Sequence, residues 1–206
     1  MENENLEELQ QESQKKINGV GRKILSIALI AVLTAIAVLV TLSTVVTKNY
    51  SFNFNDPTLI KIHTNNSSSI NNGLTFSNDS SEYKEILNLY NNSFKTKVIS
   101  ALFQGKLGEG VKVKEGYKSF STLTGAYLEF FYNETQTLYV NGEKYEANIV
   151  SDESYYVIAI EVTNSTNLTE VNAYFKYKNS NSSDYSYLRL TSYATQADLF
   201  DYIENL

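Results

Sequence analysis

The most regular pattern along the chain is an unbroken apolar run that begins at Ile24 and ends at Val46. It contains no charged residue, no proline and no glycine. Because a helix rises about 1.5 Å per residue, this run is long enough to cross a hydrocarbon core of about 30 Å. Its few hydroxyl side chains can bond back to carbonyls one turn earlier. The run therefore predicts a transmembrane helix, with the lipid bilayer as its partner.

The charges beside this run differ on its two sides. Lys15, Lys16, Arg22 and Lys23 precede it, whereas Lys48 is the nearest basic residue after it. Positive charge is retained on the cytoplasmic side of a membrane helix. The pattern therefore predicts a cytoplasmic tail over residues 1–23, a helix over residues 24–46 in the cell membrane, and an extracellular remainder.

A cleaved signal peptide is the second interpretation of the same segment. Ala35 and Ala37 flank Ile36 in the small-x-small form that signal peptidase accepts. However, the apolar run continues beyond this point to Leu42 and further, where a mature N-terminus would turn polar. We therefore favour an uncleaved signal anchor, and both interpretations place the bulk of the chain outside the cytoplasm.

A polar segment over residues 47–79 follows the apolar run and is rich in Asn, Ser and Thr. Such a composition buries too little apolar surface to offset the entropy of ordering the chain. It predicts a stalk or linker. Within it, residues 50–54 alternate aromatic and polar side chains, and residues 58–63 resemble an edge strand that Pro57 precedes.

From Ser80 onward the pattern indicates a folded domain over residues 80–206, beginning with helices. An apolar stripe at helical spacing consists of Tyr83, Ile86, Leu87, Tyr90 and Phe94. Ser80 or Ser81 is a suitable N-cap for this helix. A second, shorter helix is predicted over residues 97–104, before the glycines that follow.

Strand-like segments dominate the rest of the chain, at residues 111–113, 127–132, 137–140, 144–149, 155–163, 170–178 and 185–191. Asn141-Gly142 between two of them is a strong hairpin signal. Residues 170–178 alternate cleanly, which is typical of an antiparallel strand with one wet face. A last amphipathic helix covers residues 196–205. The predicted fold class is α+β, with helices packed on a curved antiparallel β-sheet and a C-terminal helix.

Composition excludes several classes of function. The net charge of −6 lacks the basic footprint of a nucleic-acid binder, so no nucleic acid is expected as a partner. The absence of cysteine excludes disulfides, iron–sulfur clusters and thiol nucleophiles. The single histidine, His63, is expected at a strand end and cannot form a His-based metal cluster. No cofactor is predicted.

A carboxylate pair is the one catalytic arrangement that the composition permits. Glu129 and Glu134 border predicted strands, and glycoside hydrolysis requires two carboxyl groups about 5–9.5 Å apart. Glu129 nevertheless lies on a strand whose one face is expected to be solvated. We therefore expect no enzyme, and keep a wall-directed hydrolase as an alternative.

Tyrosine is abundant, with 16 residues against no tryptophan. Tyrosine suits half-wet strand faces and also contact surfaces. A binding surface for a peptide, glycan or partner protein is predicted at Tyr155, Tyr156, Tyr174, Tyr185 and Tyr187.

The leading hypothesis is a single-pass membrane protein with a non-catalytic binding or assembly module that meets a protein or cell-wall partner outside the cell. A structural accessory subunit of a membrane complex is a further alternative.

Overall fold

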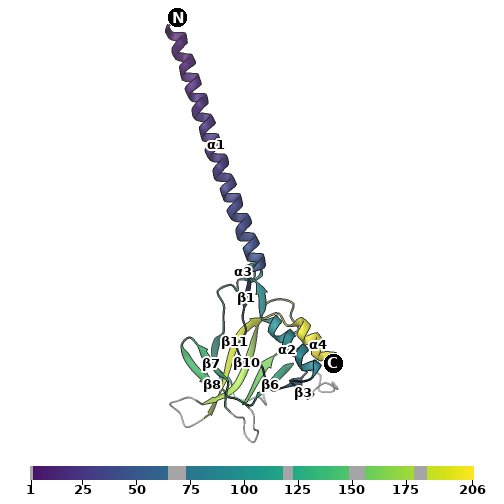
Figure 1. The fold of residues 1–206 in the computed structure, drawn as a ribbon. Helices are drawn as coiled ribbons and strands as arrows, with labels where there is room; N and C mark the ends of the chain where they lie inside the picture. Colours follow the sequence, from purple (N-terminus) through teal and green to yellow (C-terminus); the bar gives the residue numbers. More distant parts are fainter. Residues whose placement is uncertain (1, 65–72, 118–122, 149–155, 179–184) are drawn as a thin grey trace. The chain divides into compact units, whose positions relative to one another are not determined.

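The computed structural model describes residues 2–64, 73–117, 123–148, 156–178 and 185–206 (Figure 1). Of residues 2–19, 42–44, 115–117, 178 and 185 it describes the backbone alone. The chain divides into two compact units, Met1–Val46 and Thr47–Leu206. Each unit is described by itself below.

The first unit is one helix, α1 (Glu2–Val45). Its segment Val20–Thr41 has a mean hydropathy of 2.8, and none of that segment is buried. The hydroxyls of Ser26, Thr34 and Thr41 donate to carbonyls four residues earlier, at 2.8–2.9 Å. Within the described residues this is the one helix that is long and apolar enough to cross a membrane. A membrane anchor and a signal sequence both have this character.

The second unit contains a mostly antiparallel sheet, which confirms the α+β fold class. The order of its strands is β3 (Thr75–Ser77), β2 (Leu59–His63), β6 (Tyr127–Tyr132), β9 (Tyr156–Glu161), β10 (Thr169–Lys178), β11 (Tyr185–Ala194) and β5 (Lys112–Tyr117). All neighbouring strands in it are antiparallel. Two further pairs are β1 (Thr47–Asn49) with β4 (Lys95–Lys97), and β7 (Thr137–Val140) with β8 (Glu143–Glu146).

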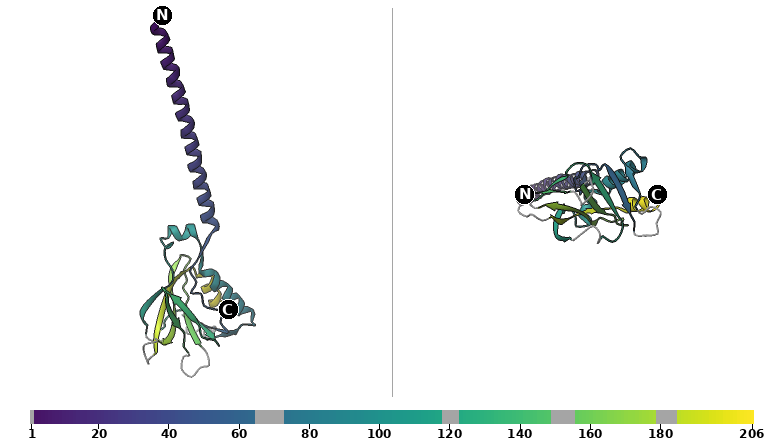
Figure 2. Two further views of the ribbon diagram at one scale, coloured as in Figure 1. Left: turned by 60° about the vertical axis from the view of Figure 1, so that its left-hand side comes forward. Right: turned by 90° about the horizontal axis from the view of Figure 1, so that it is seen from below.

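Two helices lie side by side and cover one face of the sheet, α2 (Ser81–Ser93) and α4 (Ala197–Glu204) (Figures 1 and 2). The predicted N-cap is confirmed, since the Ser80 hydroxyl accepts a hydrogen bond from the Tyr83 N–H at 3.1 Å. The predicted apolar stripe is also confirmed. Its members Tyr83, Ile86 and Tyr90 are buried in the core.

Strand β10 shows why the covered face is apolar. Val171, Ala173 and Phe175 are buried on this face, and their neighbours on the adjacent strands are buried too. In the register, Ala173 lies between Ile160 on β9 and Leu190 on β11. The period-two alternation of the sequence therefore places one continuous apolar layer under the helices.

The predicted Asn-Gly hairpin is present between β7 and β8. Asn141 and Gly142 have φ values of 53° and 86°, the left-handed conformation that a tight hairpin turn requires. Leu138 and Val140 of β7 are buried in the same core as the sheet. The turn chemistry thus determines both the reversal of the chain and which side of β7 faces inward.

The structure differs from the expectation of a stalk over residues 47–79. The folded unit begins at Thr47, and this segment contributes β1, β2 and β3. Tyr50 and Phe52 are fully buried, and β2 is an interior strand between β3 and β6 rather than an edge strand. The polar composition is misleading because β2 is stabilised by pairing with a strand far along the chain, in which Ile60 lies opposite Phe130.

The shorter elements also differ in extent from their predicted ranges. The second helix, α3 (Val98–Phe103), is separated from α2 by β4. The strand predicted over residues 111–113 continues to Tyr117 as β5.

Candidate functional site

A groove of about 740 Å³ lies between β5 and the β7–β8 hairpin. Its volume is within the range of about 300–1,000 Å³ that ligand pockets occupy. Glycines before β5, valines of both walls and a few polar side chains line it. The lining residues are Gly108, Gly110, Val111, Lys112, Val113, Val140, Asn141, Glu143 and Tyr145.

The groove runs along an edge of the large sheet. Strand β5 is the last strand in the order, and its described pairing is with β11 alone. Lys112 and Val113 are consecutive residues of a strand, so their side chains point to opposite faces of the sheet. Both nevertheless line the groove. The groove is therefore bordered by β5, the end strand in the order of the described sheet.

The wall opposite β5 is held in place by the hairpin core. Val140 is buried, and the Tyr145 ring meets the Tyr177 ring edge to face at 5.9 Å between centroids. The Tyr145 hydroxyl donates a hydrogen bond to the Glu143 carboxylate. The hairpin wall is thus a packed surface, and the carboxylate of its exposed residue Glu143 is already hydrogen-bonded.

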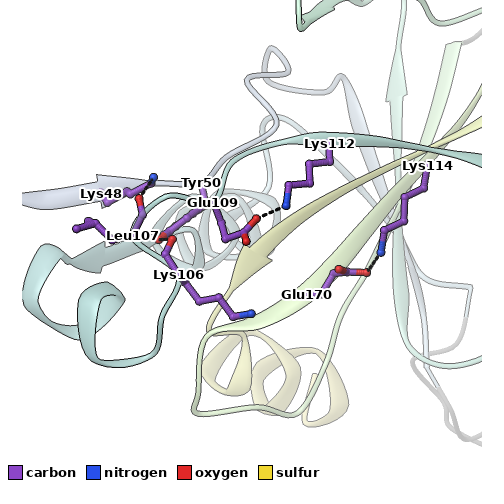
Figure 3. Close-up of polar contacts among 8 residues, drawn as sticks. All are labelled: Lys48, Tyr50, Lys106, Leu107, Glu109, Lys112, Lys114 and Glu170. Carbon is purple, nitrogen blue, oxygen red and sulfur yellow. Dashed lines mark hydrogen bonds and ion pairs between the residues drawn. The ribbon is translucent and has the colours of Figure 1, made fainter.

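Ion pairs fix the β5 side of the groove (Figure 3). Lys112 pairs with Glu109, and Lys114 pairs with Glu170 at 2.5 Å. The hydrogen bond from Lys112 holds the pKa of the Glu109 carboxyl below its usual range. The same bond raises the pKa of Lys112. Both groups therefore remain charged at neutral pH, and their charges cancel locally at this wall.

A second polar cluster lies on the sheet face opposite the helices, on β2 and β6. His63 Nε2 is 2.8 Å from a carboxylate oxygen of Glu129, and Lys61 Nζ is 3.8 Å from the same oxygen. The His63 ring is stacked on the Tyr127 ring at 4.2 Å between centroids. His63 is the last residue of β2, the strand-end position that was predicted for it.

Glu129 and Glu134 are the carboxylate pair of the hydrolase alternative. Among the described residues no contact joins these two side chains. Glu129 lies on β6 and contacts His63, whereas Glu134 is exposed beyond the end of that strand. The carboxylate diagonal to Glu129 on the sheet is Glu161 of β9. Glu161 accepts hydrogen bonds from the Tyr174 hydroxyl and the Asn172 amide, both at 2.5 Å.

The tyrosines of the predicted binding surface occupy different places. Tyr174 and Tyr187 both lie on the sheet face opposite the helices, and Tyr174 is buried there. Tyr156 pairs with Tyr132 and packs against the core on the helix-covered side. The Tyr185 backbone is in β11 opposite Lys178. Tyr155 lies outside the described residues.

Sequence reasoning missed the groove because its two walls are far apart along the chain. The hairpin signal at Asn141-Gly142 identified one wall, and the valines at 111 and 113 identified the other. Nothing in either pattern indicates that the walls face each other. In the described residues no group of three or more His, Asp and Glu side chains is placed to hold a metal ion.

Comparison of the chain with protein-family models, with curated proteins and with solved structures gives no match.

Proposed function

We propose that the protein is a single-pass, membrane-anchored, non-catalytic binding module. Its domain lies outside the cell and binds an extended polypeptide segment in the groove beside β5. The observation that carries this proposal is a groove of ligand size along the edge of a strand that pairs, among the described residues, on one side only.

An extended peptide suits this site because a sheet edge can accept a further strand. Main-chain hydrogen bonds then supply affinity, and side-chain pockets supply specificity. Val111 and Val113 on one wall and Val140 on the other offer apolar contacts, and Gly110 lets a second backbone approach closely. Lys112 and Lys114 are paired with Glu109 and Glu170. The β5 edge therefore carries no net positive charge from these lysines, which is suitable for a neutral peptide.

The anchor is supported by the exposure of α1. None of its apolar segment Val20–Thr41 is buried, as is suitable for a helix in lipid. The basic residues before the apolar run support the cytoplasmic position of the N-terminus and an extracellular position of the domain.

Binding rather than catalysis is supported by the chemistry of the groove lining. Its ionisable side chains are Lys112, Glu143 and Tyr145. Lys112 is engaged by Glu109, and Glu143 accepts a hydrogen bond from Tyr145. Nucleophilic catalysis needs a nucleophile within hydrogen-bond reach of a base. The His63–Glu129 pair, which has acid–base character, is not among the lining residues.

Hydrogen exchange on the full chain in lipid nanodiscs tests the peptide site. Short synthetic peptides of unrelated sequence are screened for binding, and exchange is then measured with and without a bound peptide. We expect those amides of residues 112–114 that point away from β11 to become protected. Val111→Asp should abolish both binding and protection, whereas Leu74→Asp, a partly exposed apolar residue outside the lining, should leave both unchanged. Binding that is equal in both variants would overturn the peptide site.

Single-cysteine labelling tests the anchor, because the natural chain has no cysteine. In intact cells a membrane-impermeant maleimide should label Asp198→Cys. The same reagent should label Glu4→Cys only after the cells are permeabilised. A product that lacks the Glu4→Cys peptide would show cleavage and refute the anchor. Labelling of Glu4→Cys alone in intact cells would refute the orientation.

A further inference from the structure

Helix α3 and the turn after it carry an exposed apolar patch of Leu102, Phe103 and Leu107. Their side chains are 54%, 84% and 37% exposed. In the described part of the second unit few other large apolar side chains are exposed, and these three lie within six residues of one another. Phe103 is the most exposed of them. An exposed phenylalanine forgoes the free energy that burial of its ring would provide. A group of such exposed apolar side chains therefore indicates a contact surface.

Hydrogen bonds fix this patch to the body of the domain. The Lys106 N–H donates to the Ala101 carbonyl at 2.8 Å, and the Tyr50 hydroxyl donates to the Lys106 carbonyl at 2.7 Å. Lys48 Nζ donates to the Leu107 carbonyl (Figure 3). The Leu168 N–H donates to the Gln104 side chain at 2.9 Å. The apolar side chains are therefore presented by an ordered, hydrogen-bonded base.

The patch lies close to Thr47, where the second unit begins. Thr47, the first residue of β1, is bonded to Val46 and lies opposite Lys97, the last residue of β4. Opposite residues of an antiparallel pair have Cα atoms about 5 Å apart. Helix α3 starts at the next residue, Val98, and its six residues extend about 9 Å. Helix α3 therefore lies within about 20 Å of Thr47, the first residue of the second unit.

Basic side chains lie on the segments next to the patch, and the carboxylate of Glu109 interacts electrostatically with Lys48 and Lys106. Lys95 and Lys97 of β4 are exposed, and Lys48 and Lys106 are partly exposed. Lys48 lies over the Tyr50 ring at 5.0 Å, and Lys106 lies over the Tyr193 ring at 4.6 Å. An exposed apolar cluster with lysines on neighbouring segments suits insertion between lipid headgroups. Lysine stems can lie along apolar surface while their ammonium groups reach phosphates.

We infer that Leu102, Phe103 and Leu107 insert into the outer interface of the bilayer in which α1 is anchored. The inference rests on the proposed membrane anchor. It gives the domain a second attachment to the membrane, adjacent to its tether, so that the domain does not rotate freely about residues 46–47. The β5 groove then has a defined orientation toward the membrane surface.

The absence of tryptophan makes a direct test available. Single-tryptophan variants of the full chain are reconstituted into phosphatidylcholine vesicles that contain brominated lipid, which quenches tryptophan on contact. Phe103→Trp is the probe and Tyr139→Trp, on β7 and 68% exposed, is the matched control. Val38→Trp reports insertion of α1. Leu107→Trp is a second probe of the patch if Phe103→Trp does not fold.

We expect Phe103→Trp to lose emission to lipid brominated near the headgroup and to shift its emission to the blue. Val38→Trp should be quenched more strongly by lipid brominated near the chain end, and Tyr139→Trp should not be quenched. Quenching of Val38→Trp without quenching of Phe103→Trp and Leu107→Trp would overturn this inference and leave the anchor intact. Absence of quenching at Val38→Trp would overturn the anchor itself.

Discussion

The two units of the chain use apolar residues in opposite ways. In α1, Leu33 is 56% and Ile36 is 50% exposed, and the apolar residues continue around the whole helix. In the domain, Phe130 is 1% exposed and Ile158 is fully buried, and apolar residues alternate with polar ones along the strands. Each side chain of this size gains about 1.5–3 kcal/mol when it leaves water. The domain obtains this free energy from its own core, whereas the exposed apolar side chains of α1 do not obtain it from burial within the described structure.

The difference shows that periodicity carries as much information as hydrophobicity. A run that is apolar on every side of a helix has no direction in which to pack, so it predicts lipid. A stripe or an alternation has a direction and predicts a core. The α3 patch belongs to neither class, because its apolar residues lie on an otherwise folded domain and remain exposed.

Charges placed in the middle of α1 should have the largest effect. Leu33→Arg combined with Ile36→Arg costs about 5–7 kcal/mol of insertion free energy, from about 2.5–3.5 kcal/mol for each charge at a helix centre. We expect the chain to move from the membrane pellet to the soluble fraction on alkaline extraction. Leu33→Phe combined with Ile36→Phe should stay in the pellet. A doubly charged variant that is retained as firmly as the natural chain would contradict the proposed lipid environment of α1.

A truncation in the core should have the next largest effect and should act on the domain alone. Phe130 is packed edge to face against Tyr90 at 4.9 Å between centroids. Phe130→Ala is expected to reduce the free energy of unfolding by about 3–5 kcal/mol, through lost burial and the cavity that remains. Urea denaturation of the full chain in detergent measures it by tyrosine fluorescence. Leu33→Ala, a truncation in α1, should leave the domain transition unchanged, and an equal loss in both would show that the two units fold together.

Local patterns in the sequence predicted much of this fold. The alternation around Val171, Ala173 and Phe175 was sufficient for β10, and Ser80 with the stripe from Tyr83 was sufficient for α2. Asn141-Gly142 was sufficient for the hairpin. Each of these elements is determined by interactions within a few residues, which a sequence displays directly.

Long-range pairing could not be predicted in the same way. Strand β2 is short and is surrounded by polar residues, and its position in the sheet depends on β6 more than sixty residues later. Tyr156 precedes four consecutive buried residues, so no alternation indicated that it faces the core. The groove depends on where the hairpin lies relative to β5. Such contacts follow from the closure of long loops, for which no local residue pattern exists.

A capping substitution should have a smaller effect that is again confined to the domain. Ser80→Ala removes the side chain that accepts the Tyr83 N–H bond, and caps of this kind contribute about 1 kcal/mol. We expect the midpoint of urea unfolding to fall with little change in slope. Ser81→Ala, one residue inside the helix, should change stability by less than about 0.5 kcal/mol. If both variants behave alike, Ser80 does not act as the cap of α2.

Removal of the Tyr132 hydroxyl should have the smallest effect at neutral pH and a distinct one at alkaline pH. This hydroxyl is buried and has no hydrogen-bond partner among the described residues. Burial raises its pKa well above the ordinary value of about 10. The folded state therefore keeps the proton where the unfolded state releases it, so the stability from the neutral hydroxyl is fully present below about pH 10 and is lost as the pH rises further.

Tyr132→Phe should thus leave the free energy of unfolding at pH 7 unchanged or raise it by less than about 1 kcal/mol, because an unpaired polar group leaves the core. Between pH 10 and 11 the variant should lose less stability than the natural chain. Tyr139→Phe, at an exposed position, should follow the natural chain at both pH values. Residues 24–46 contain no titratable group, so alkaline extraction should not release α1 over the same range. Identical alkaline profiles for Tyr132→Phe and the natural chain would show that the domain opens around Tyr132 before this hydroxyl ionises. The contrast between a pH-sensitive core and a pH-insensitive helix would then not depend on Tyr132.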